Sequence, residues 1–297
     1  PLVMTVDRVS YGPLGSPGSG PRPPGPPGPA GKSAWTPLYD TFARPWTSPD
    51  PQWHRIEWVW RSPGLMECAF LPANVATAPA AAPDRAVLTC RERQGKAQGG
   101  WLESDRQTGY GAYRARLKIS PPNRTDLNKG CCNAFFHYGP RGEIDMEFRS
   151  RWQGTIYPGL LDLVVHRNDG RGNSLASHHV PLLLPFDPSA AWHDYGFDWR
   201  PGRIDFLVDG RVVHTFTGTR AVPVPAAAGT LHLNCWSGMI AWGGMPEPGG
   251  RDFLVEWVSA APCLLGAHPP LLSLSRGGTA RLDLDGGAAA AGMAYLV

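Results

Sequence analysis

The chain has 297 residues, enough for one large β domain with tails or for two ordinary domains. Its net charge of +3 is small and scattered, which argues against a nucleic-acid or anionic-membrane binder. No apolar run approaches the ~18 residues that a membrane helix needs. Hydrophobic residues make up 42% of the chain, so it can form a sizeable core.

Residues 1–34 are rich in Gly, Pro and Ser, and residues 25–31 have a short collagen-like spacing. This run is far too short for a triple helix, so we interpret 1–34 as a disordered linker. After Cys263 the chain is dominated by Gly, Ala and Leu. Residues 263–297 are therefore expected to be a flexible tail or the first strands of a second β-module.

Between these segments, residues 35–262 form short apolar or alternating runs broken by Gly, Pro, Asn and Asp. This pattern predicts an all-β sandwich, and 32 prolines discourage long helices. Asp209-Gly210 separates two runs and is a strong two-residue hairpin signal. The expected strands cover residues 110–119, 133–137, 144–148, 160–165, 195–199, 203–208, 211–216, 231–236 and 253–258.

The chain has six cysteines and no C-x-x-C spacing, which argues against zinc and for disulfides. Cys68 and Cys90 lie in neighbouring strand-like segments and could pair; the alternative is that several of the six are buried thiols. Cys131 and Cys132 are adjacent, so on a strand they point to opposite faces. The triplet 123–125 is an N-glycosylation pattern. Together these features favour a secreted protein, which we expect to be a monomer.

The segment 142–148, GEIDMEF, carries the most specific signal in the sequence. On a helix its three acids would scatter, whereas on a strand Glu143, Asp145 and Glu147 share one face and the apolar residues face the core. Three like charges in line are costly unless a ligand or a reaction uses them. The pattern therefore predicts a functional site.

Two carboxyl groups on one face fit the hydrolysis of a glycosidic bond. A retaining enzyme needs its carboxyl groups about 5–5.5 Å apart. Positions i and i+4 of a strand lie about 13 Å apart at the backbone, a gap that two Glu side chains can shorten by leaning inward. The middle Asp145 can then keep the pKa values of the two Glu apart, so that one is a nucleophile and the other an acid. An oxygen-ligated calcium site is the alternative, but ligands along one strand cannot surround an ion unaided.

The segment 143–147 resembles the active-site signature of glycoside hydrolase family 16. Other motifs extend the resemblance over about residues 38–262: GYGAYRARLK at 109–118, AFFHYGP at 134–140, WHDYGFDW at 192–199, VDGRVVHT at 208–215, LNCWSG at 233–238 and WGG at 242–244. The resemblance implies a jelly-roll of two curved antiparallel sheets with the substrate along the concave face.

The same resemblance implies roles for single residues. Glu143 would be the nucleophile, Glu147 the general acid and base, and Asp145 the assisting carboxylate. No cofactor is implied, although a structural calcium ion stays open. The side chains that would contact the sugar are Phe136, Asn234 and Trp236, with His166, Trp101 and Glu103 as further candidates.

The spacing of the acids narrows the expected substrate. One residue separates Asp145 from Glu147, which resembles lichenases and xyloglucan-active members rather than laminarinases, whose strand usually bulges there. Arg141 and Gly142, however, replace residues that lichenases often carry, and a Gly there is similar to laminarinases. We therefore expect an endo-acting β-glucanase, and the expected substrate is mixed-linkage β-1,3-1,4-glucan. A transglycosylase with the same covalent intermediate, a non-catalytic carbohydrate-binding jelly-roll and a generic adhesion-type sandwich are the alternatives.

Overall fold

The computed structural model describes residues 37–43, 52–61, 65–77, 85–126, 128–149, 151–152, 155–156, 159–171, 173–240 and 242–262. Over these residues the chain forms 19 strands and one 3-10 turn, η1 (Pro72–Asn74). None of the helical structure in this part of the chain is long and apolar enough to cross a membrane. The predicted linker at 1–34 and the predicted tail or module at 263–297 lie outside the described residues.

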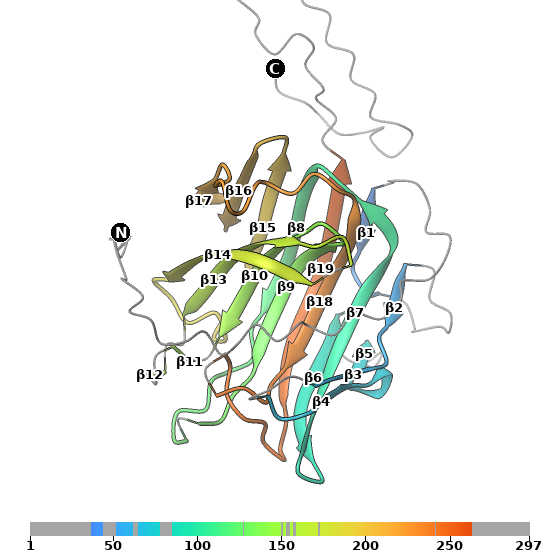
Figure 1. Cartoon of the computed structure of the whole chain (residues 1–297). Coiled ribbons are helices and arrows are strands. Elements are labelled where there is room, and N and C mark those ends of the chain that lie inside the picture. The colour runs from blue at the N-terminus through green and yellow to red at the C-terminus, as the bar shows by residue number, and fades with distance from the viewer. Residues whose placement is uncertain are drawn as a thin grey trace, which may run out of the picture.

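The first sheet carries the predicted acidic strand near its middle and is antiparallel throughout (Figure 1). Its spatial order is β14 (Ser174–Leu183), β13 (Leu160–Asn168), β10 (Gly142–Arg149), β9 (Cys132–Gly139), β18 (Gly229–Trp236), β7 (Lys96–Thr108) and β2 (Trp53–Arg55).

The second sheet packs against the first and is also antiparallel. Its order is β17 (Arg211–Phe216), β16 (Arg203–Val208), β15 (His193–Arg200), β8 (Gly111–Lys118), β19 (Arg251–Pro262), β6 (Ala86–Arg93) and β5 (Val75–Thr77), with β1 (Leu38–Asp40) also paired to β19.

Strand β7 joins the two sheets into one strongly curled surface. Its first residues pair with β6 and, in parallel, with β4 (Cys68–Phe70), which pairs with β3 (Trp58–Trp60). Its later residues pair with β18 and β2 of the first sheet. Hydrogen bonding therefore runs through 17 strands, while β11 (Arg151–Trp152) and β12 (Thr155–Ile156) form a separate pair.

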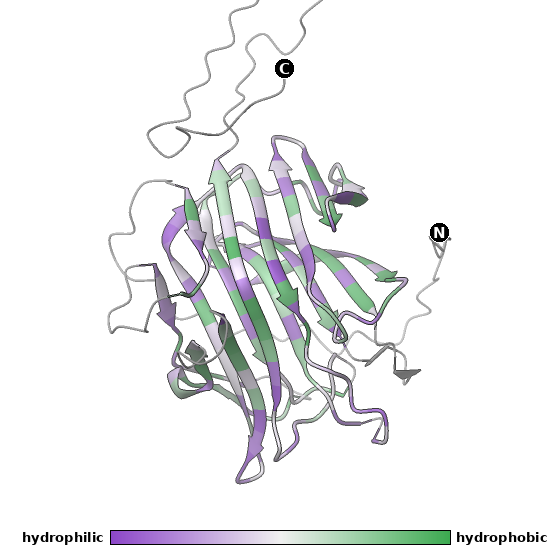
Figure 2. Cartoon of the chain, turned by 180° about the vertical axis from the view of Figure 1, so that it is seen from behind, coloured by the Kyte–Doolittle hydropathy of each residue, from purple (hydrophilic) through white to green (hydrophobic). Residues whose placement is uncertain are grey.

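The main core lies between the two sheets because each strand turns alternate side chains inward. On β10, Ile144, Met146 and Phe148 are at most 2% exposed and belong to this core. Phe148 meets Tyr195 of β15 edge to face, with ring centroids 4.7 Å apart. Hydrophobic and hydrophilic residues accordingly alternate along the strands in Figure 2. The predicted all-β sandwich is confirmed.

The predicted hairpin at Asp209-Gly210 connects β16 and β17. Both residues have positive φ, 48° and 73°. A two-residue turn of this type needs that conformation at both positions, and its twist matches that of the flanking strands. Gly supplies it without steric cost, which explains why the sequence predicted this turn so directly.

The described cysteines correct the expectation of a disulfide. Cys68 and Cys90, together with Cys131, Cys132 and Cys235, are all buried free thiols. Cys90 Sγ contacts Ser237 Oγ at 3.1 Å instead of bonding Cys68, although the two thiols are close enough for Cys90 to raise the pKa of Cys68 beyond the effect of burial. Cys131 belongs to the main core and Cys132 to the cluster on the opposite face, as the sequence predicted.

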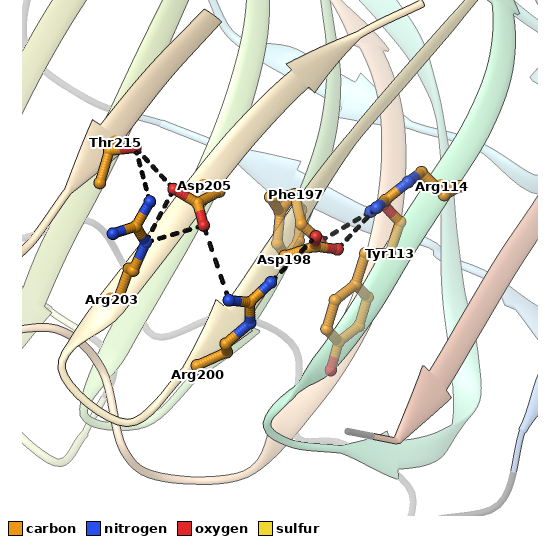
Figure 3. Close-up of polar contacts among 8 residues, drawn as sticks. All are labelled: Tyr113, Arg114, Phe197, Asp198, Arg200, Arg203, Asp205 and Thr215. Atoms are coloured by element: carbon orange, nitrogen blue, oxygen red, sulfur yellow. Dashed lines mark hydrogen bonds and ion pairs between the residues drawn. The ribbon is translucent and has the colours of Figure 1, made fainter. Parts of the chain in front are cut away.

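The outward face of the second sheet carries a ladder of paired charges (Figure 3). Asp198 accepts from Arg114 at 2.6 Å and lies 3.5 Å from Arg200. Asp205 accepts both contacts of the Arg203 Nε–H, at 2.8 and 3.0 Å, and the hydroxyl of Thr215 at 2.6 Å. The pKa of Asp205 is lowered, first by its bond to Arg203. The contacts of Asp198 with Arg114 and of Asp205 with Thr215 join neighbouring strands, and pairs of this kind stabilise a sheet, so these acids have a structural role.

Candidate active site

The three predicted acids lie on β10 and face away from the main core. Glu143 and Asp145 are only 5% and 3% exposed, and Glu147 is half-buried. The strand pairs without a register shift from residue 142 to 148 with β13 and from 142 to 149 with β9. This confirms the predicted regular strand, and its alternation places the three acids on one face, which we call the site face.

The register shows which side chains share the site face with each acid. Directly paired positions place Asp145 in a row across the first sheet with Glu103, His232, Phe136, Val164 and His179. The row of Glu147 contains Trp101, Asn234, Ala134 and Asp162, and the row of Glu143 contains Tyr138, His166 and Ser177. Every predicted site residue except Trp236 lies in one of these three rows, and Trp236 is the next site-face position along β18 after Asn234.

His166 holds the middle acid. Its Nε2 lies 3.1 Å from Asp145 Oδ2, and its Nδ1 lies 3.0 Å from Ser174 Oγ. A hydroxyl on one ring nitrogen leaves the other free to donate to the carboxylate, which fixes the orientation of the ring. The structure therefore brings His166 to the site, but its bond is to Asp145; contact with a sugar stays a prediction.

Glu147 differs electrostatically from an ordinary carboxyl group. Its pKa is raised to about 8, first by burial and then by the charges of Asp145 and Asp162, while Arg149 and His166 oppose the rise. A carboxyl group with such a pKa is largely protonated at neutral pH. Glu147 can therefore donate a proton, the task that the sequence predicted for it, and the Asp145 charge contributes as expected.

The structure shows a charged cluster beside Glu147 that the sequence did not predict. Arg149 and Asp162 are 7% and 1% exposed and form an ion pair at 2.8 Å. His179 Nδ1 lies 3.1 Å from the same carboxylate oxygen. The Arg149 guanidinium lies 4.0 Å from the ring centroid of Trp242, whose Nε1–H donates to Glu147 Oε2 at 3.1 Å.

A second chain of hydrogen bonds leads to Glu103. Trp101 Nε1–H donates to His232 Nδ1 at 3.0 Å, and the Thr230 hydroxyl donates to Glu103 Oε1 at 3.0 Å. Because indole can only donate, His232 Nδ1 is an acceptor and its Nε2–H donates to Thr230 Oγ1 at 2.8 Å. His232 is thus neutral in this arrangement, and the chain orients Glu103 as an acceptor.

The predicted aromatic contacts are mostly covered. Phe136, Trp101 and Trp236 are at most 4% exposed. Trp101 packs edge to face against Trp58 at 5.7 Å, and Trp236 does so against Trp60 at 4.7 Å. These rings lie on the site face, where Trp58 and Trp60 of β3 cover Trp101 and Trp236, and their contact with substrate stays a prediction.

Four half-buried aromatic residues on this face escaped the sequence reasoning as site residues: Trp58, Trp60, Tyr138 and Trp242. The Trp-x-Trp spacing of residues 58–60 was the one sequence signal that could have indicated two rings on a common strand face.

Asn234 and Gly142 add two details. Asn234 is only 5% exposed, and its buried Oδ1 has no hydrogen-bond partner among the described residues. A buried amide oxygen of this kind is available to a ligand hydroxyl. At Gly142, an added Cβ would lie 2.8 Å from the Pro225 ring, so close packing explains the glycine.

The side chains of Glu143, Asp145 and His166 offer ligand-type atoms within 4.8 Å of one another. Asp145 and His166 already contact each other, and the grouping follows from their rows on adjacent strands. We assign no metal to this cluster.

Solved structures show the same architecture. The beta-glucanase of Bacillus licheniformis superposes with a TM-score of 0.60 at 22% identity, over 77% of this chain and 99% of that chain. A native glycosidic hydrolase superposes with a TM-score of 0.61 at 26% identity, over 77% and 98%. These likenesses define the class of the protein: a strongly curled, antiparallel β-jelly-roll, as the sequence predicted.

The family follows from the sequence comparison. The model of Glycosyl hydrolases family 16 matches residues 72–258, and the chain belongs to this family. The beta-glucanase of Acetivibrio thermocellus is 29% identical over 196 residues, which are 63% of this chain and 51% of that protein. The beta-glucanase of Bacillus amyloliquefaciens is 33% identical over 136 residues, 44% and 48% of the two chains. The chain thus spans about half the length of the curated relatives it matches.

Proposed function

We propose that the protein is a retaining endo-glycosidase that cleaves β-glucan, with mixed-linkage β-glucan as its substrate. The observation that carries the proposal is the electrostatic environment of the carboxyl groups on β10. Glu147 has a pKa raised to about 8, and it shares its face with the largely buried carboxyl groups of Glu143 and Asp145. A retaining glycosidase needs one protonated and one ionised carboxyl group, which flank the scissile bond.

The mechanism assigns one task to each acid. Glu147 donates its proton to the glycosidic oxygen while the Glu143 carboxylate attacks the anomeric carbon, which forms a covalent glycosyl-enzyme. The ionised Glu147 then removes a proton from water, and the attacking oxygen releases the sugar from Glu143. Asp145, held by His166 at 3.1 Å, keeps negative charge between the two and favours protonation of Glu147 in the resting enzyme.

Three observations support the choice of substrate. The similar relatives are named as beta-glucanases, and a solved relative from a mouse hindgut metagenome is described as a lichenase. The regular pairing of β10 across residues 142–148 agrees with the lichenase-like spacing. The buried Oδ1 of Asn234, in the same row as Glu147, is positioned to accept from a sugar hydroxyl.

Product analysis on lichenan, laminarin, xyloglucan and agarose tests the proposal. We expect oligosaccharides from lichenan, with the β configuration retained in the first product. Release from agarose or xyloglucan alone would contradict the substrate. Labelled oligosaccharide acceptors separate hydrolysis from transglycosylation, because products longer than the donor arise only when a sugar hydroxyl intercepts the intermediate.

Secretion stays a prediction. In the predicted glycosylation triplet, Asn123 Nδ2 donates to Glu247 Oε1 at 2.7 Å, and Glu247 also bonds Arg251. A glycan on this nitrogen would leave it a single N–H, so the bond to Glu247 would depend on that one hydrogen.

A further inference from the structure

We infer that Trp242 is a positioning residue for the proton donor. Its N–H donates to Oε2 of Glu147, and this bond places the transferable proton on Oε1. The inference rests on the proposed function, in which Glu147 protonates the glycosidic oxygen. It concerns a residue that the reaction chemistry alone does not require.

The hydrogen bond itself has a fixed direction. Trp242 Nε1 lies 3.1 Å from Glu147 Oε2, and an indole nitrogen can only donate. In a protonated carboxyl group the carbonyl oxygen is the better acceptor, because the other oxygen carries the proton. The bond therefore favours Oε2 as the carbonyl oxygen and Oε1 as the oxygen that carries the proton.

Two side chains hold the ring of Trp242, one against its face and the other in an edge-to-face contact. The Arg149 guanidinium lies 4.0 Å from the ring centroid, a distance at which a cation and an indole face attract each other. Asp162 keeps this guanidinium in place at 2.8 Å. His179, which contacts Asp162, meets the ring of Trp242 edge to face at 5.6 Å.

The backbone around Trp242 is equally restrained. Trp242 N–H donates to the Met239 carbonyl at 3.0 Å, and Met239 and Gly244 form an isolated bridge. Gly243 packs directly on the start of β9, where an added Cβ would lie 2.7 Å from Cys132 N. Contacts from β9, β10, β13 and β14 thus fix a loop residue on the acid.

The bond has a consequence in each half of the reaction. During glycosylation the proton on Oε1 moves to the glycosidic oxygen, the bond from that oxygen to the anomeric carbon breaks, and Glu143 bonds to this carbon. Glu147 is left as an anion, and a hydrogen bond to an anion is stronger than one to the neutral acid. Trp242 therefore stabilises the product of the proton transfer and lowers the pKa of Glu147 relative to a site without the N–H.

Other groups around Glu147 also influence its titration. The charged and titratable side chains that face it, or that act on it through a neighbour, are Asp145, Arg149, Asp162, His166, His179 and Cys132. A substitution that removes only the N–H and keeps an aromatic ring over Arg149 leaves all of them in place.

Trp242→Phe is that substitution, and Trp192→Phe is its matched control. Trp192 also lies under an arginine, Arg85, at 5.6 Å, but it precedes β15 of the second sheet.

In Trp242→Phe, we expect the basic limb of kcat/KM to move upward by about half to one pH unit. Hydrolysis of methylumbelliferyl β-laminaribioside falls roughly tenfold, whereas hydrolysis of the dinitrophenyl glycoside, whose leaving group needs little acid assistance, changes less than about twofold. Trp192→Phe retains the parent profile.

Glu147→Gln separates failure of the inference from failure of the proposed function. If this variant loses the methylumbelliferyl substrate far more than the dinitrophenyl one, Glu147 is the acid; an unshifted basic limb in Trp242→Phe then overturns the inference alone. Equal losses on both substrates in Glu147→Gln overturn the acid assignment and the inference with it. Carboxyl carbon NMR of Glu147 in Trp242→Phe gives the pKa without turnover. Trp242→Leu is the second variant without the N–H if the Phe variant fails to fold.

Discussion

Carboxylates lie on the outward faces of both sheets, but the two faces use them differently. On the second sheet Asp198 and Asp205 are matched by arginines on the same or neighbouring strands, and the pKa of Asp205 is lowered. On the site face, acids stand beside acids along β10, and burial and like charge raise the pKa of Glu147 to about 8. The comparison shows that the partners of an acid, more than its strand position, separate a stabilising role from a chemical one.

The largest expected effect is the loss of activity when the proposed nucleophile is removed. Glu143→Gln keeps the shape of the side chain but cannot form the glycosyl-enzyme, so kcat on lichenan should fall by roughly a thousandfold or more. Asp205→Asn, the matched change on the second sheet, should leave kcat within about twofold. Full activity of Glu143→Gln, measured by reducing-sugar release, would refute the assigned nucleophile.

Glu147→Gln should stabilise the folded protein at high pH. The folded pKa of Glu147, about 8, exceeds its ordinary value of 4.5, so the folded state holds the proton more tightly and loses stability as pH rises from 4.5 to 8. A neutral Gln removes this loss. We expect Glu147→Gln to match the parent near pH 4.5 and to exceed it by on the order of 1–3 kcal/mol above pH 8.

Urea unfolding followed by tryptophan fluorescence at several pH values measures this difference. A constant offset between Glu147→Gln and the parent at all pH values would show that Glu147 titrates normally in the folded protein.

The smallest effect should come from the charge ladder. Asp205→Asn removes the charge that pairs with Arg203 but can keep the contact with Thr215, so the free energy of unfolding should fall by about 0.5–1 kcal/mol near neutral pH. The loss should shrink at high salt and disappear as pH falls below the lowered pKa of Asp205, where the parent is also uncharged. Thermal unfolding at low and high salt checks this; a salt-independent loss would indicate a packing role.

Local patterns predicted the parts of this molecule that depend on local geometry. The alternation of residues 142–148 placed three acids on one face and three apolar side chains in the core, and Asp209-Gly210 predicted its turn. Contacts set by strand order were beyond such patterns. Arg149, Asp162 and His179 meet because β10, β13 and β14 are neighbours in one register, and no periodicity of a single segment reveals that. The pairing of cysteines failed for the same reason.

The pairing of β1 with β19 has a consequence for chain connectivity. Leu38 lies opposite Ala260, so the first and last described strands of the domain are direct neighbours. Ends that lie together can be joined by a short peptide, and a chain can then be opened elsewhere without changing which strands pair. The turn at Asp209-Gly210 is a suitable opening, because it belongs to the hairpin at the far edge of the second sheet. The order in which the strands follow one another along the polypeptide is therefore separable from the architecture that holds the acids of β10 in place.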